Sequence, residues 1–529
     1  MASKSAFMRD ATGLVRSFSW YDALIVSLAV TGPTYFGIAS QIGYIAPSDP
    51  GAEFTISAII GVLFMVPLGI MYYIFSTQMP RSGGDYIWMG RSLHPSIGFV
   101  AGWAMWLSFV ALLSGGAGAW GSVVVPDFAL TMGYTWHNVG LINWATSFVT
   151  PNNVFLSGML GVVIFGVIIT SLGARIYSKV MITLAIIVFL GTFIMLAFVI
   201  GTSNAAFASD FTSFFTSTPG AASVTYSGIL SSAATNNFPY LPITTSATLL
   251  SIPFGVLLFN GFNYSVYISG EVKNAKYSML WGVIIALVIC AVIDILGLFF
   301  AMRMLSYPFN QAAFSLFGAG QLSLGVAPWL AVFVPAILGN AYLATFVQFS
   351  FLVFFPWWAC GLVLSASRYV FAFSFDRILP TAFADINERL HIPLKATILT
   401  LVVGAILVAF TAYTSYIGQV LNTTTIWAIV WIVVGISAIA FPIRRKDLAK
   451  GLPGGPRVLQ IFGALSIVAM AITLYFALTT PAIGPATPAA DGLLATIFGS
   501  GIIIYAARYY YFKGKGINLG AVLSEIPPE

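Results

Sequence analysis

The chain contains 529 residues, of which 59% are hydrophobic and only 7% are charged. Soluble domains carry roughly a quarter of their residues as charges, so this composition excludes a soluble surface and predicts one membrane domain. The formal net charge of +6 does not indicate a nucleic-acid partner, because the 22 basic residues lie in short clusters at the ends of apolar segments.

Apolar stretches of about 20 residues, which as helices cross a bilayer core of roughly 30 Å, begin after residue 19. The cytoplasmic tail predicted over 1–19 has no small-residue cleavage site before a helix, so we expect no cleaved signal peptide. The chain then contains twelve such stretches: 20–42, 55–77, 97–124, 153–173, 178–200, 247–269, 279–304, 345–373, 394–412, 423–442, 459–479 and 490–510. We therefore predict an all-α membrane protein with 12 transmembrane helices.

The positions of lysine and arginine predict how these spans are oriented, since short cytoplasmic loops retain both residues. With the N-terminus inside, every basic residue except Arg303 falls on a cytoplasmic segment, and the external loop 201–246 contains none. We therefore predict a multi-pass protein of a prokaryotic cell membrane. Both termini are expected in the cytoplasm, including a C-terminal tail over 512–529.

Two further stretches are predicted to lie on the external face. Residues 326–343 are apolar enough to span, but a span there would place the basic cluster from Arg368 to Lys395 outside. We expect this stretch to lie on or dip into the external face. The loop 201–246 is rich in Ser, Thr, Ala and Gly, and we expect an external cap without a packed core.

Helix-breaking residues interrupt the first and sixth spans. The first contains Thr31-Gly32-Pro33-Thr34, and the sixth contains Pro253 followed by Phe259-Asn260-Gly261. Backbone groups freed in hydrocarbon must be satisfied by protein, water or ligand, so breaks are tolerated around a buried or wet cavity. Either break alone has a simpler explanation, since glycine and proline are common in membrane helices as kinks and packing points. The pair of breaks favours a binding site.

The two broken spans are the first members of two five-helix halves. An odd number of helices per half inverts the second half, and interrupted segments at matching positions indicate a transporter's midplane site. We predict a ten-helix core over 20–442, with repeat one at about 20–200 and repeat two at about 247–442. Two additional helices follow over 443–511.

Three short motifs fall on predicted cytoplasmic segments. They are Pro80-Arg81-Ser82-Gly83-Gly84-Asp85-Tyr86, Ser269-Gly270-Glu271-Val272-Lys273-Asn274, and Ser367-Arg368-Tyr369 with Asp376-Arg377-Ile378-Leu379-Pro380. In this order and spacing, the chain resembles the amino acid–polyamine–organocation (APC) family over nearly its whole length. The resemblance implies a 5+5 inverted-repeat (LeuT-like) core with broken helices 1 and 6, and an amino acid permease that works by alternating access. The motifs themselves are expected to be turns and charge anchors.

The resemblance also places the substrate site at the two breaks. It implies that the substrate is bound by Thr31, Gly32, Pro33, Thr34, Phe259, Asn260 and Gly261. Phe259 is expected to be an aromatic wall or gate, with simple packing as the alternative, and Asn260 a hydrogen-bond partner of the solute. The N–H groups that begin a half-helix suit a carboxylate, and the carbonyls that end the preceding one suit an ammonium.

The chain departs from the family pattern at two places. The family's Gly-Ser-Gly type motif is Gly32-Pro33-Thr34 here, and Pro33 has no N–H to donate. We expect the amides of Thr34 and Tyr35, with the Thr34 hydroxyl, to replace it. Asn263 stands where relatives often have a carboxylate, which argues against a cationic substrate.

Asp294 is the one acidic residue deep inside a predicted span, where an unpaired charge is costly. Two roles stay open: it carries a coupled proton, or it is hydrogen-bonded to a neighbouring helix. Arg303 lies about two and a half turns away on the opposite helix face and is not its partner. The resemblance implies that a proton-coupled member has a lysine in the fifth span at the position of a sodium ion, but here no basic residue follows Lys179 until Lys273. The eighth span, at Phe354-Phe355-Pro356-Trp357-Trp358, offers no hydroxyl for sodium. The coupling ion, H⁺ or Na⁺, stays unassigned.

Other classes of protein fit the sequence less well. The three histidines, His94, His137 and His391, lie in or near loops on opposite sides, so no enzyme site is expected. Cys290 and Cys360 lie inside apolar segments, so neither a disulfide framework nor a metal site with paired cysteines is expected. No cofactor is predicted. The sequence has no repeated pore loop typical of a channel. Besides amino acids, an amine or nucleobase substrate and a sensor without net transport remain alternatives. The expected partners are a small-molecule substrate and the lipid bilayer.

Overall fold

The computed structural model describes residues 14–414, 423–480, 488–516 and 519–520, and these fold as helices without a strand. Eleven helices among them are long and apolar enough to cross a membrane. They are α1–α2 (Trp20–Thr31 and Tyr35–Ser48), α3 (Phe54–Gln78), α5–α6 (Pro95–Thr135), α8–α9 (Pro151–Thr170), α10 (Ala174–Gly201), α15–α16 (Ala275–Leu305), α19 (Ala341–Phe375), α20 (Leu394–Tyr413), α21 (Thr423–Arg444), α23 (Pro456–Thr479) and α24 (Pro488–Gly514). Each coincides with a predicted span.

The predicted span at 247–269 is divided into three short helices and is not among the eleven. These are α13 (Thr245–Leu250), α14 (Ile252–Leu258) and the 3₁₀ helix η3 (Tyr264–Glu271). Between α14 and η3, residues 259–263 form turns. The break therefore lies where the sequence predicts it.

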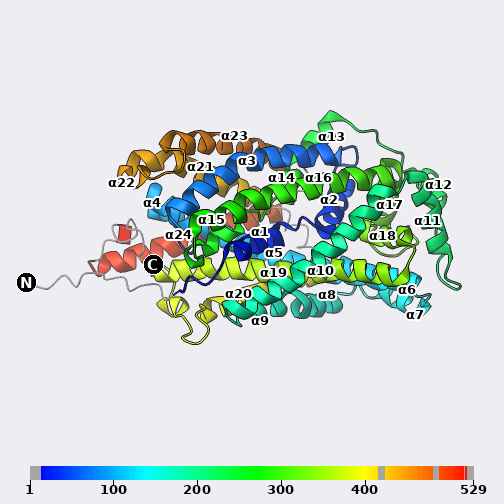
Figure 1. Cartoon of the computed structure of the whole chain (residues 1–529), viewed down its shortest axis with the longest axis horizontal. Coiled ribbons are helices and arrows are strands. Elements are labelled where there is room, and N and C mark those ends of the chain that lie inside the picture. Colours follow the sequence, from blue (N-terminus) through cyan, green and yellow to red (C-terminus); the bar gives the residue numbers. More distant parts are fainter. Residues whose placement is uncertain (1–13, 415–422, 481–487, 517–518, 521–529) are drawn as a thin grey trace, which may run out of the picture.

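The long helices run side by side along the longest axis of the molecule (Figure 1). One end, which we call the α4 end, holds α4 (Asp85–Ser92), α15 (Ala275–Met279) and α22 (Lys446–Ala449). The opposite end, the α7 end, holds α7 (Val139–Ser147), α11 (Asn204–Thr216) and α12 (Tyr226–Thr235). Segments that carry basic clusters, such as α15 and α22, thus share one end.

The segment between α10 and α13 has a packed core, so the prediction of a cap without one is wrong. Phe207, Phe211 and Phe215 recur every fourth residue on one face of α11 and are fully buried. The rings of Phe207 and Phe211 pack on Phe309 of α17 (Tyr307–Gly318) and Phe333 of α18 (Leu330–Leu338), with Phe211 to Phe309 at 5.4 Å, and the ring of Phe215 packs on Phe211. With nine residues, α18 is too short to span, and it lies at the α7 end (Figure 1). The external position of 326–343 stays a prediction.

The first break begins at Gly32, which follows Thr31 and adopts a left-handed conformation with φ of 70°. A Cβ at this position would lie 2.7 Å from the ring of Phe354, so the site needs glycine for its conformation and for space. The second break touches the first. Gly261 has φ of 112°, and a Cβ there would lie 2.5 Å from the backbone nitrogen of Thr31. The two breaks form one junction.

Helices α3 and α14 approach each other closely through glycines, as small residues permit in membranes. A Cβ on Gly255 would lie 2.1 Å from the carbonyl oxygen of Ser57, so no side chain fits without backbone movement. Gly255→Ala is expected to destabilise the fold by about 1–3 kcal/mol, the usual effect of overpacking, seen as a lower melting temperature in detergent. Gly499→Ala is the control, because nothing lies within 4 Å of its added Cβ. Equal melting temperatures for both variants would contradict the prediction.

Candidate functional site

A cavity of about 310 Å³ extends from the junction of the two breaks toward the α7 end. Its wall is largely aromatic and apolar, with Phe36 of α2, Phe355 and Trp358 of α19, and Trp329, which precedes α18. Polar groups also line it: Thr31, Ser40, Gln41, Tyr44, Ser122, Asn260 and Thr423. Among the described residues that line the cavity, none carries a charge. The cavity therefore suits a solute that is neutral overall and has an apolar part.

Two of the seven predicted site residues, Thr31 and Asn260, line the cavity. The Thr31 hydroxyl donates to the carbonyl of Ser27 at 2.8 Å and keeps lone pairs for a ligand. Asn260 lies at the second break and is 4% exposed. The other five predicted residues build the junction around the cavity and are not part of its wall: Gly32, Pro33, Thr34, Phe259 and Gly261. A direct contact between these five and a solute stays a prediction.

The amides at the start of α2 are used differently from the expectation. The Thr34 amide donates to the Gly32 carbonyl at 2.7 Å, and the Tyr35 amide donates to the Thr192 hydroxyl of α10 at 3.0 Å. Both amides that were expected to replace the missing N–H of Pro33 are therefore already hydrogen-bonded within the protein. Phe36 and Gly37, next in the first turn, line the cavity. First-turn amides have no acceptor within their helix, so this turn presents the positive end of α2 to the cavity.

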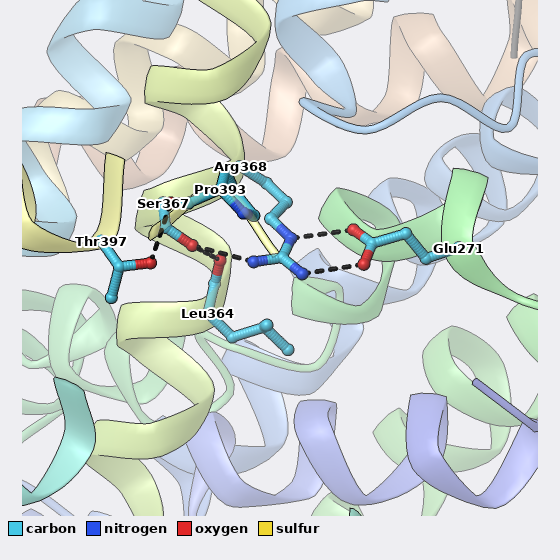
Figure 2. A network of polar contacts seen from close by, with 6 residues as sticks. All are labelled: Glu271, Leu364, Ser367, Arg368, Pro393 and Thr397. Atoms are coloured by element: carbon cyan, nitrogen blue, oxygen red, sulfur yellow. Dashed lines mark hydrogen bonds and ion pairs between the residues drawn. The ribbon is translucent and has the colours of Figure 1, made fainter. Parts of the chain in front are cut away.

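At the α4 end, two of the sequence motifs meet in a buried ion pair. The Arg368 guanidinium donates from Nε and Nη2 to the two carboxylate oxygens of Glu271, both at 2.8 Å, and from Nη1 to Ser367 at 3.1 Å. Figure 2 shows this two-pronged pair joining α19 to η3. The side chains are only 1% and 4% exposed, so the pair is dry and its geometry is specific.

The remaining motif residues extend this network. Arg91 of α4 pairs with Asp376 after α19 at 2.8 Å, and the Tyr86 hydroxyl donates to the same carboxylate. Asp85 accepts hydroxyls from three elements: Tyr72 of α3, Tyr267 of η3 and Tyr369 of α19. Burial raises the pKa of Asp85 to about 6, although the tyrosine hydrogen bonds act against the rise.

We call Asp85, Arg91, Glu271, Arg368 and Asp376 the polar lock. The lock joins the segment after α3, the end of η3 and the end of α19, and none of its members lines the cavity. The motifs predicted as turns and charge anchors are thus buried ion pairs and hydrogen bonds that close the bundle at the α4 end.

Two carboxylates inside the candidate spans stand apart from this network. Asp294 and Asp127 are fully buried, and neither carboxylate has a hydrogen-bond partner among the described residues. Asp127 was missed because the third span was predicted to end at 124, whereas the helix continues to Thr135. Arg303 donates to the carbonyl of Ile200 and not to Asp294, as predicted. Within the described ranges, no group of three or more His, Cys, Asp or Glu is placed to hold a metal ion.

Helices broken beside a cavity in an apolar bundle are typical of proteins that bind and release a solute. The fold and the cavity thus define a membrane transporter. The chain belongs to the amino acid permease family, whose sequence profile matches residues 18–501. This family consists of transporters rather than enzymes.

Proteins similar to this chain match about three quarters of its length. The methylthioribose transporter of Bacillus subtilis (strain 168) is 23% identical over 397 residues, covering 75% of each chain. The branched-chain amino acid permease of Lactococcus lactis subsp. cremoris (strain MG1363) is 23% identical over 420 residues, covering 78% of each. Protein 399 of Sulfolobus islandicus rod-shaped virus 1 is 24% identical over 393 residues, covering 74% of this chain and 72% of the viral one.

Proposed function

We propose that this protein is a secondary transporter that moves neutral amino acids with large apolar side chains across the cell membrane by alternating access. The observation that carries the proposal is the uncharged, aromatic cavity at the junction of the two broken helices. Family membership supports an amino acid as the substrate, and the relative named for branched-chain amino acids has the same kind of solute.

The cavity offers a place for each part of such a solute. The first turn of α2, at Phe36 and Gly37, suits the carboxylate because it combines free N–H groups with the positive helix end. The Asn260 carbonyl oxygen and the Thr31 hydroxyl suit the ammonium group. Trp358 and the other aromatic residues suit the apolar side chain. A lysine or glutamate side chain would bring an unpaired charge into this wall, which is costly.

In the proposed topology the chain spans the membrane twelve times, and Thr245–Glu271 is the interrupted sixth span. In this topology the α4 end faces the cytoplasm, and the basic residues of α15 and α22 at that end support this orientation, because short cytoplasmic loops retain lysine and arginine. The cavity then faces outward and the polar lock closes the inner side. Alternating access requires the lock to open when the cavity closes.

Ligand binding to the purified protein tests the substrate class. Leucine is expected to raise the melting temperature in detergent, since a ligand that binds only the folded state adds about 2.7 kcal/mol at one hundred times its Kd. Lysine and glutamate are expected to have no effect. Asn260→Ala should abolish the leucine effect, whereas Asn236→Ala, at the exposed end of α12, should keep it. Stabilisation by methylthioribose or by amines, and not by leucine, would contradict the proposal.

A further inference from the structure

We infer that Asp294 is the binding site of a proton whose movement is coupled to that of the solute. The inference goes beyond the proposed function, which leaves the coupling ion open, and its transport test rests on that function. It starts from the position of Asp294 on α16 (Ala286–Leu305), which packs against both halves of the broken first span.

The Asp294 carboxylate faces the backbone of the first break. A Cβ built on Gly37 would lie 3.2 Å from Oδ1 of Asp294 and 2.2 Å from the carbonyl oxygen of Gly32. The space beside the Gly37 Cα is therefore bounded by the Asp294 carboxylate and by the carbonyl oxygen of Gly32, which lies at the break. Any side chain at position 37 would fill this space, so glycine keeps the carboxylate next to the break.

The surroundings of Asp294 favour a neutral carboxylic acid. The side chain is fully buried, and neither oxygen has a partner among the described residues. The titratable group that interacts with it is the Cys290 thiol, one turn earlier on α16 and beside Thr31. No charged side chain that the structure describes on α1, α2, α3 or α10 interacts with the Asp294 carboxylate. An ionised carboxylate here would lack a counter-charge at a cost of several kcal/mol, which a bound proton removes.

The same short segment contacts Asp294 on one side and the cavity on the other, because Gly37 also lines the cavity. An ionised Asp294 would repel a substrate carboxylate at the start of α2, whereas the protonated form would not. Proton binding and substrate binding therefore favour each other, and this coupling is reciprocal. The proton adds to a carboxylate oxygen from the outside and leaves it when the lock opens and water reaches the break.

Asp127 provides a matched control inside the same protein. It is also fully buried and without a hydrogen-bond partner in the described part of the chain. It lies on α6 (Val125–Thr135) and interacts with the Tyr35 side chain, not with the Gly32 carbonyl. Asp127→Asn therefore removes a buried acid and leaves the carboxylate at the break in place.

The transport test uses the full chain in proteoliposomes with labelled leucine and the membrane potential held at zero. A gradient of about one pH unit, acidic outside, is expected to sustain about tenfold accumulation for one coupled proton. Asp294→Asn is expected to exchange leucine at equal pH on both sides but to lose accumulation. Asp127→Asn should accumulate leucine like the unmodified protein. Accumulation by Asp294→Asn, or accumulation driven by sodium and not by protons, would overturn the inference.

Infrared spectroscopy of the protein without substrate tests proton binding independently of transport. We expect a carboxylic-acid C=O band at neutral pH that Asp294→Asn removes and Asp127→Asn leaves in place. If Asp294→Asn does not fold, Asp294→Glu should retain accumulation and shift this band. No band assignable to residue 294 would overturn the inference, even with transport intact. If the unmodified protein shows this band but does not exchange leucine, the proposed substrate is wrong and the proton site stands.

Discussion

Glu271→Ala is expected to shift the protein toward a state that is open at the α4 end. The substitution leaves the Arg368 guanidinium, 1% exposed, without its counter-charge. Removing one partner of a buried ion pair typically costs about 3–5 kcal/mol. This cost applies only while the end is closed, because water hydrates the guanidinium once it opens. An energy difference of about 5.5 kcal/mol moves a two-state equilibrium from 1:99 to 99:1, so the expected shift is large.

Hydrogen–deuterium exchange would measure this shift. Amides of η3 should exchange faster in Glu271→Ala, whereas those in the aromatic core of α11 should not change. Lys395→Ala is the control at the same end, since its pair with Asp385 is 55% and 60% exposed and such pairs contribute at most about 1 kcal/mol. Replacing both partners, as Glu271→Leu with Arg368→Met, should restore protection because no charge stays buried. Unchanged exchange in Glu271→Ala would mean that the pair does not hold the end closed.

The sequence predicts the spans and their breaks because both depend on local composition. Apolar length defines the helices, and Gly32, Pro33 and Gly261 mark backbone that cannot remain helical. The end of the third span was predicted too early because Pro126 and Asp127 resemble a helix boundary. In the structure the helix continues through a π-helical turn at Trp120–Val124 into α6, and this change of hydrogen-bonding pattern accommodates Pro126, which has no amide to donate.

The candidate site was predictable only where the backbone itself forms it. Thr31 precedes the first break and Asn260 lies in the second, and both line the cavity; their contact with a solute stays a prediction. Trp329 and Trp358 of the cavity wall were not predicted, because in a chain with 15% aromatic residues no local pattern separates them from packing aromatics. The motifs of the polar lock could be identified, but Glu271 and Arg368 are 97 residues apart and only the fold brings them together. Partners of this kind follow from helix packing, which composition does not specify.

Asp85 is expected to make the closed end more stable in mild acid than at neutral pH. Its pKa is raised from 3.8 to about 6, so the folded state holds this proton more tightly than the unfolded state. The contribution of Asp85 to the free energy of unfolding therefore falls as pH rises from about 4 to about 6, and it stays low above that range. The difference corresponds to roughly 3 kcal/mol. Asp85→Asn cannot titrate and should lack this part of the pH dependence.

Melting temperatures of both proteins at about pH 4.5 and about pH 7.5 test this expectation. Acidification should stabilise the unmodified protein more than Asp85→Asn. Burial also raises the pKa of Asp49 to about 6, and the comparison cancels its contribution because both proteins contain Asp49. Asp447→Asn is the control, because a hydrogen bond from Arg445 lowers the pKa of Asp447 and keeps it ionised throughout this range. An equal response of Asp85→Asn and the unmodified protein would mean that the three tyrosine hydroxyls fully compensate for burial. The lock would then hold Asp85 as a carboxylate without a penalty.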